Sequence, residues 1–211
     1  MGHAIATLLG WAVLAGAAGA LLLVLLRGAR DHGILAPVAV GLGVRLAVML
    51  VAHGGSTSLG DGGFFYLDDQ TYMRGATRLA HLWAQGSLPD PGRYDVVGTH
   101  LFGYQFLVAV LFGLGTTSVV LGKLANVLIG AVTVYLVARI AGRVLGEQAQ
   151  VRGAWLAALA PSLVWWSAPL MKEAVVTMAI ALGVFAATTL PRRLSAATFG
   201  VALAMLVLLR I

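Results

Sequence analysis

The sequence predicts an all-α integral membrane protein, a polytopic transmembrane helical bundle of about six spans. Sixty per cent of its 211 residues are hydrophobic and only 10% are charged, whereas a soluble domain carries about 25% charged residues. Apolar runs recur along the whole chain, and a helix that crosses the bilayer needs about 20 such residues. The 27 glycines favour the close helix approach on which packing in lipid depends.

Six apolar runs are candidates for spans. The first, residues 5–26, carries no charge and is followed by Arg27 and Arg30, whereas a signal peptide carries its basic residues before the apolar run. We therefore expect residues 1–33 to form an additional, retained N-terminal transmembrane helix, ahead of a unit covering residues 34–211. The other five runs within that unit are 34–53, 117–140, 153–168, 170–190 and 195–209.

Two segments interrupt this pattern. Residues 54–100 are polar, glycine-rich and aromatic, and form a long hydrophilic loop. The apolar segment 101–114 is too short to cross, because about 14 residues of helix reach about 21 Å and the hydrocarbon core is about 30 Å thick. We predict that residues 101–114 lie at the membrane interface or re-enter the membrane without crossing it.

The basic residues predict the orientation, because positive charge accumulates on the cytoplasmic side. If residues 101–114 do not cross, most arginines near span ends share one side, namely Arg27, Arg30, Arg139, Arg143, Arg152, Arg192 and Arg193. The acidic loop 54–100 then faces outward, most naturally from a plasma membrane. These basic residues are dispersed over span ends, so the net charge of +6 does not indicate nucleic-acid binding.

The sharpest chemical signal lies at residues 66–85. Asp68 or Asp69 can cap a helix, and the residues that follow separate into two faces at helical spacing. The apolar face is Tyr72, Ala76, Leu79, Ala80 and Trp83, and the polar face is Gln70, Arg74, Thr77, Arg78 and His81. This pattern predicts an amphipathic helix on the outer membrane surface, with its arginines level with the lipid phosphates.

The adjacent carboxylates of Asp68 and Asp69 admit two interpretations. A helix cap needs only one of them, whereas two neighbouring carboxylates repel each other, which is typical of a base or a cation site. If the protein holds a divalent cation, these two aspartates are its expected ligands. No other cofactor is indicated, since the chain has no cysteine and its histidines show no metal-ligand spacing.

Basic residues inside the predicted spans form a second candidate group, because ionisable side chains are costly in lipid. Arg45 lies near the middle of its span, whereas Lys123 and Arg210 lie near outer ends, where snorkelling also accounts for them. If these cations converge under the acidic loop, they form a site suited to a lipid phosphate.

A second outward corner carries Lys172 and Glu173, which open a span that is otherwise uncharged. Glu173 either complements the positive end of that helix or adds a carboxylate to the side that holds Asp68 and Asp69. His100 opens the short interfacial segment, and a lone histidine there is either a surface polar group or a substrate contact.

The order of these features resembles the start of GT-C glycosyltransferases, in the branch related to protein O-mannosyltransferases and aminoarabinose–lipid A transferases. The resemblance covers roughly residues 34–211. It is carried by a span ending near an arginine, Asp-Asp-x-x-Tyr from Asp68 to Tyr72, Phe112-Gly113, Lys123-Leu-Ala-Asn126, the stretch from Arg139 to Gly146, and Pro161-Ser-Leu-Val-Trp-Trp-Ser167 before Lys172-Glu173.

The resemblance implies a sugar transfer from a polyprenyl-phosphate donor on the outer face of the membrane. Asp68 matches the family's loop carboxylate, a catalytic base or cation ligand, and Asp69 stands where many members have glutamate. Lys123 would meet the donor phosphate, helped by Arg45 or Arg74, and Glu173 matches an acidic residue that opens a later span. Where several members have Lys-Pro-Pro, this chain has Thr99-His100-Leu101, and the family's enzymes are much longer.

The sequence therefore predicts a glycosyltransferase, complete or as the N-terminal part of one, with the sugar and the acceptor left open. Two alternatives remain. A transporter fragment would use Arg45 and the acidic loop to handle a solute, although no pair of corresponding broken spans indicates an inverted repeat. A non-catalytic membrane subunit would keep the architecture alone.

Overall fold

The computed structural model describes residues 2–87, 102–114, 117–189 and 191–209, and every regular element in these ranges is a helix. The predicted all-α class is therefore confirmed for the described chain. The helices, in chain order, are α1 (Gly2–Asp31), α2 (Leu35–Ser58), α3 (Leu67–Ala84), α4 (Phe102–Leu114), α5 (Val119–Leu145), α6 (Glu147–Leu159), α7 (Pro161–Trp166), α8 (Glu173–Thr189) and α9 (Arg192–Leu209).

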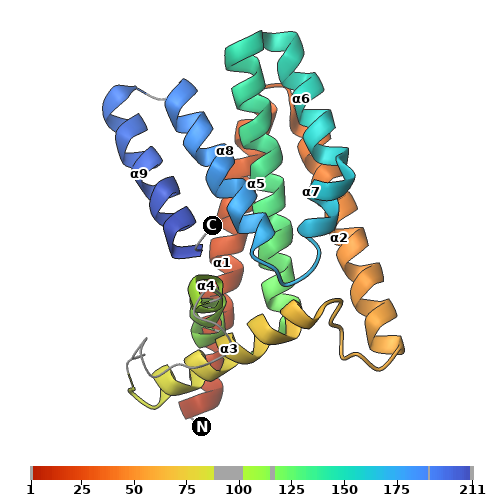
Figure 1. Ribbon diagram of the computed structural model, residues 1–211, viewed down its shortest axis with the longest axis vertical. Helices are drawn as coiled ribbons and strands as arrows, with labels where there is room; N and C mark the ends of the chain where they lie inside the picture. Colours follow the sequence, from red (N-terminus) through yellow and green to blue (C-terminus); the bar gives the residue numbers. More distant parts are fainter. Residues whose placement is uncertain (1, 88–101, 115–116, 190, 210–211) are drawn as a thin grey trace.

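Three helices are long and apolar enough to cross a membrane: Leu9–Asp31 within α1, and the whole of α2 and of α5. They run along the long axis of the molecule (Figure 1). Because the apolar parts of α8 and α9 are shorter and the fourth predicted run is divided into two helices, the expected number of about six spans is not confirmed. The described chain is a helical bundle with three candidate spans.

The fourth run differs from the sequence prediction in both its start and its continuity. We expected one span over 153–168, but α6 begins at Glu147 and ends at Leu159, and α7 begins at Pro161. Proline has no N–H to continue the hydrogen bonds of α6, whereas its fixed φ suits the first turn of a new helix. The early start follows from Gly146, whose φ of 92° turns the chain sharply back after α5, a conformation that favours glycine.

Helices α3 and α4 lie across one end of this bundle. In Figure 1, α3 runs across the lower end of the molecule and α4 is seen nearly end-on, so neither follows the direction of α1, α2 and α5. The described residues 102–114 thus lie crosswise to the candidate spans, and their place at the membrane interface stays a prediction. Tyr104 of α4 packs edge-to-face on Tyr72 of α3, with ring centroids 4.8 Å apart.

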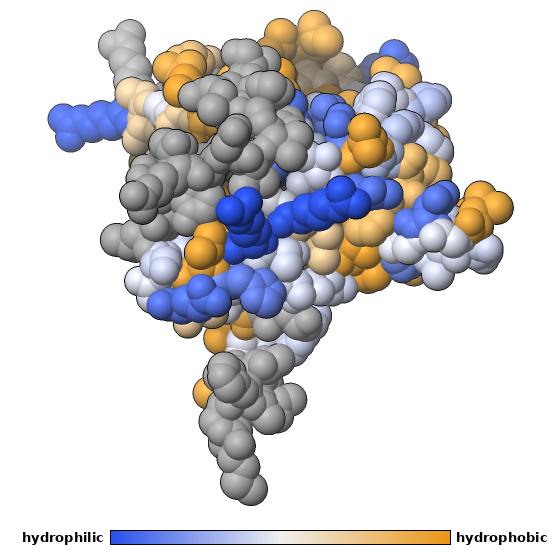
Figure 2. Space-filling model, turned by 60° about the horizontal axis from the view of Figure 1, so that its bottom comes forward, coloured by the Kyte–Doolittle hydropathy of each residue, from blue (hydrophilic) through white to orange (hydrophobic). Residues whose placement is uncertain are grey.

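In the described residues, three apolar clusters hold the helices together. The first lies between α3, α4, the start of α8 and the end of α9, the second joins α1, α2, α5 and α6, and a small third one consists of Met49, Val127 and Ala168. Many large apolar side chains nevertheless face outward, among them Val24, Val51 and Leu156, each about 70% exposed (69%, 76% and 73%). An apolar exterior of this kind is expected where a helix faces lipid. Hydrophilic side chains gather instead on the end that α3 crosses (Figure 2).

Candidate functional site

The first turn of α3 carries both aspartates, but neither is the N-cap that the sequence suggested. Tyr66 is the N-cap, in extended conformation and without a side-chain cap bond. The chain turns into the helix at Leu67, so Asp68 and Asp69 are its second and third residues, where the helix N-terminus favours negative charge. Asp69 reaches backward instead, and its Oδ2 accepts a hydrogen bond from the backbone N–H of Phe65 at 3.0 Å.

The two aspartates have different surroundings. Asp68 is exposed, whereas Asp69 is fully buried. Neighbouring residues on a helix point in directions about 100° apart, and here one direction leads to solvent and the other into the bundle. Asp68 and Asp69 therefore do not present both carboxylates to one cation, and no group of three or more potential metal-ligating residues occurs in the described part of the chain.

Asp69 pairs with Lys123 of α5. The lysine Nζ lies 3.9 Å from the Asp69 Oδ2, and the two side chains are only 1% and 0% exposed. Lys123 also donates a hydrogen bond to the backbone oxygen of Gly63 at 2.5 Å. Burial raises the pKa of Asp69, and the Phe65 N–H and the Lys123 ammonium oppose that rise. The pair thus ties the loop before α3 to α5.

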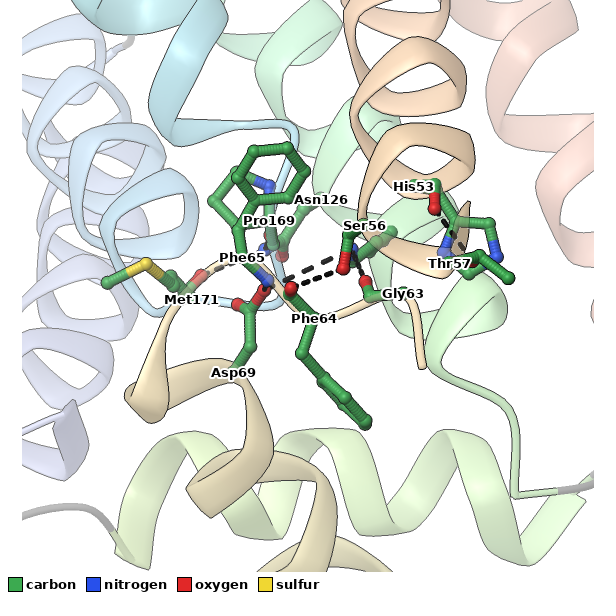
Figure 3. A network of polar contacts seen from close by, with 11 residues as sticks. His53, Ser56, Thr57, Gly63, Phe64, Phe65, Asp69, Asn126, Pro169 and Met171 are labelled. Carbon is green, nitrogen blue, oxygen red and sulfur yellow. Dashed lines mark hydrogen bonds and ion pairs between the residues drawn. The ribbon is translucent and has the colours of Figure 1, made fainter. Parts of the chain in front are cut away.

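Asn126, one turn after Lys123, holds the corner between α7 and α8. Its Nδ2 donates to the backbone oxygens of Pro169 and Met171, both at 2.8 Å, and its Oδ1 accepts from the Tyr104 hydroxyl at 3.1 Å. Figure 3 shows this amide between the two carbonyls of the corner. Our site prediction omitted Asn126 and Tyr104. Three residues separate Lys123 and Asn126, which places both on one face of α5, and this polar pairing inside an apolar helix was the available signal.

Glu173 joins the same region as the first residue of α8. Tyr72 is buried beside it: burial raises the pKa of the Tyr72 hydroxyl, and the negative charges of Glu173 and Asp68 raise it further. The structure therefore brings together residues from α3, α5 and α8 that the sequence nominated from separate segments. Lys172, next to Glu173, is partly exposed.

The remaining nominated residues lie elsewhere. Arg45 is fully buried, and its guanidinium donates to the backbone oxygens of Gly41, Ala157 and Ala158. Arg74 is exposed on the polar face of α3 and donates to Gln70. His100 and Arg210 lie outside the described residues.

The amphipathic character predicted for α3 is confirmed. Tyr72, Ala76, Leu79 and Ala80 are buried, and Trp83 packs against the same apolar cluster. On the opposite face Arg74, Arg78 and His81 are exposed. The helix therefore presents a basic row to its surroundings at the end of the bundle.

An apolar groove runs beside the site. Its volume is about 630 Å³, and its walls are one side of α2, the loop residues Asp61, Phe64 and Phe65, and Trp165 of α7. The Trp165 indole donates a hydrogen bond to the Tyr66 hydroxyl at 2.8 Å. The groove therefore ends at the same loop that Asp69 and Lys123 hold in place.

Comparison with known proteins assigns no relative: no family model, no curated protein and no solved structure matches this chain. Its function has to be argued from the residues and their arrangement.

Proposed function

We propose that this protein is a GT-C-type membrane glycosyltransferase that transfers a sugar from a polyprenyl-phosphate donor to an acceptor at the outer surface of the plasma membrane. The proposal rests on one observation above all. Asp69 of α3 pairs with Lys123 of α5, and Asp68 of α3 and Glu173 of α8 both act on the hydroxyl of Tyr72, although about 50 residues separate α3 from Lys123 and Lys123 from Glu173 along the chain. This is the set that the resemblance singles out.

The apolar groove supports a lipid-linked donor. A volume of about 630 Å³ is within the range of small-molecule sites, about 300–1,000 Å³. Its apolar lining suits an isoprenoid chain, and the loop at its end carries the chain into α3. A donor lying there would bring its phosphate and sugar towards Asp68 and the corner at Lys172 and Glu173.

Asp68 is the proposed base. It would take the proton from an acceptor hydroxyl or amine, whose oxygen or nitrogen forms a bond to the anomeric carbon of the sugar. The bond from that carbon to the phosphate oxygen breaks on the opposite face, and the lipid phosphate leaves with the electron pair. The transfer inverts the anomeric configuration. Asp68 suits this role better than Asp69 because it is exposed to an incoming acceptor.

The exposure of each basic side chain decides which of them can contact the phosphate of the donor. Lys123 is buried and already bonded to Asp69 and Gly63, so it reaches a phosphate only if the loop before α3 moves away. Lys172 is partly exposed and Arg74 is exposed, and both can offer positive charge to the departing phosphate. Lys123 then serves mainly by holding the loop that leads into α3 and Asp68.

The test is the Asp68→Asn variant, assayed in membranes with a panel of radiolabelled polyprenyl-phosphate sugars. Asparagine keeps the side-chain shape but cannot act as a base, so the rate of sugar transfer should fall by about 10²–10⁴-fold, as is typical when a general base is lost. Asp31→Asn is the matched control, because it makes the same change at the exposed end of α1 and should leave the rate unchanged.

Two results would count against the proposal. If no donor in the panel is consumed by the wild-type protein, the transporter and non-catalytic subunit alternatives take its place. If transfer occurs but Asp68→Asn is as active as Asp31→Asn, the base lies elsewhere. A loss of activity in Asp69→Asn alone would assign the role to the buried carboxylate.

A further inference from the structure

Arg45 is a fully buried arginine near the middle of a candidate span, where an ionisable group is costly and needs partners. Its Nη1 donates to the backbone oxygens of Gly41 at 3.0 Å and Ala158 at 2.9 Å, and its Nη2 donates to that of Ala157 at 2.9 Å. Two of these oxygens belong to the last turn of α6. The guanidinium therefore caps a helix end on a neighbouring helix.

The reason for this cap lies in Pro161. In a continuous helix the oxygen of Ala157 would accept from the N–H of residue 161, and proline has none. In lipid, a carbonyl without a donor cannot turn to water. Arg45 supplies the missing donor, and two glycines make room for it. A Cβ on Gly130 would lie 2.8 Å from the Arg45 Nε, and one on Gly41 would lie 3.2 Å from its Nη1.

The capping interaction leaves one nitrogen of Arg45, the Nε, without a hydrogen bond. Within the described chain, the Arg45 Nε and the Glu173 Oε2 are both buried and have no hydrogen-bond partner. Both residues line the same small cavity, whose volume is about 30 Å³. The two residues that carry this buried donor and this buried acceptor thus line one cavity, and the two atoms are not hydrogen-bonded to each other.

Three hydroxyl groups complete the polar lining of this cavity, those of Thr133, Ser167 and Thr177. Each donates its own hydrogen to a backbone oxygen of its helix, at 3.0, 2.9 and 2.8 Å respectively. The lone pairs of these hydroxyl oxygens remain available, so the hydroxyls can act as acceptors towards the cavity.

We propose that this cavity is an internal water site that bridges the guanidinium of Arg45 and the carboxylate of Glu173. A buried water needs about 10–15 Å³ and two to four polar partners, so the volume suits one or two molecules. A water there accepts from the Arg45 Nε–H, donates one hydrogen to the Glu173 Oε2 and offers the other to a hydroxyl. The charge inside the bundle is then balanced through water. This inference does not depend on the proposed enzymatic function.

The site is tested by nuclear magnetic resonance on protein labelled with ¹⁵N-arginine in lipid nanodiscs. The Arg45 Nε–H signal is assigned by its absence in Arg45→Lys. It should show a through-space cross-peak with the water resonance. The sign of that cross-peak should be the sign of a dipolar contact and not that of proton exchange. Glu173→Met should abolish the contact, because it replaces the acceptor with an apolar chain. Glu147→Met is the matched control: it also changes the first residue of a helix, but an exposed one.

Two outcomes would overturn the water site: no water contact at the Arg45 Nε–H in the wild-type protein, or a contact that Glu173→Met leaves unchanged. If Glu173→Met does not fold, Thr133→Val combined with Thr177→Val decides the question. These near-isosteric changes remove two exchangeable hydroxyl protons while both charged partners remain. Persistence of the contact supports a bridging water, whereas its loss would mean that the hydroxyls had relayed the signal.

Discussion

At the scale of single residues, the site combines an exposed carboxylate with a buried ion pair. Asp68 faces outward, while the neighbouring Asp69 is enclosed with Lys123. Burying two charges costs more than their attraction returns unless further hydrogen bonds satisfy them. The backbone N–H of Phe65 and the backbone oxygen of Gly63 provide such bonds. The pair therefore anchors the loop that leads into α3 and Asp68.

Breaking this anchor should destabilise the protein more than removing it entirely. Lys123→Leu leaves Asp69 buried without its partner and should lower the free energy of unfolding by about 3–5 kcal/mol. The double variant Asp69→Leu and Lys123→Leu leaves no uncompensated charge and should recover much of that loss. Denaturation in mixed detergent micelles measures both, with Asp31→Asn as a surface control. Losses that simply add in the double variant would contradict this account.

The sequence placed Asp68, Asp69 and Glu173 on one side of the membrane and Lys123 near the outer end of a span, but it could not rank the two aspartates. Which of two adjacent residues is buried depends on where the helix begins and on what packs over it. Here α3 begins at Leu67, and α5 lies against Asp69. Asn126 escaped the site prediction for a similar reason, because its partners are backbone oxygens of a corner whose position only the fold determines.

At the scale of elements, the presence of Pro161 in α7 accounts for the buried position of Arg45 in α2. The sequence placed an arginine in one span and a proline in another, and nothing in the linear order connects them. In the fold, the arginine donates to the carbonyl that the proline leaves without a partner. The division of the predicted span 153–168 into α6 and α7 has the same origin, since a proline there removes a donor whatever the surrounding hydropathy.

The coupling between Arg45 and Pro161 can be measured by a double-mutant cycle. Arg45→Met should destabilise the protein by about 1–3 kcal/mol for each carbonyl left without a donor. In a Pro161→Ala background the restored N–H can serve Ala157, so the same substitution should cost about 1–3 kcal/mol less. Unfolding in detergent gives the four free energies. Additivity within about 0.5 kcal/mol would show that the two residues are independent.

The basic row of α3 carries a prediction about membrane lipid. Arg74 and Arg78 are exposed on the face of α3 that turns away from the apolar cluster, and each basic residue near an anionic surface contributes about 1 kcal/mol of attraction. Arg74→Gln combined with Arg78→Gln should therefore release bound phosphatidylglycerol, as observed by native mass spectrometry. The lysine substitutions at both positions keep the charge and should retain the lipid. If both double variants retain the same amount of phosphatidylglycerol, the prediction that α3 lies on the membrane surface is wrong.

At the scale of the whole molecule, composition and apolar run length predict a helical membrane protein, and the described part of the chain has three helices long and apolar enough to span a membrane. The number of spans was harder to predict, because hydropathy does not report where a helix breaks or how it is tilted. The length of α4 predicted that it is too short to cross the membrane, but not the direction in which it lies. The bundle end that gathers the site was not, since it depends on the packing of α3 against α4 and α8.

The orientation of the bundle is the last prediction, and single-cysteine labelling can test it because the chain has no cysteine of its own. A cysteine replacing Leu59, which is 81% exposed after α2, should react with a membrane-impermeant maleimide in intact cells, because the loop before α3 is expected outside. A cysteine replacing the exposed Gln148 at the start of α6 should react only after permeabilisation. Within the turn between α5 and α6, Gln148 is a better position for the cysteine than Gly146. Gly146 has a φ of 92°, a conformation that a cysteine rarely adopts. The reverse pattern of labelling would place Asp68 and the groove on the cytoplasmic side, away from the outward face that the proposed transfer requires.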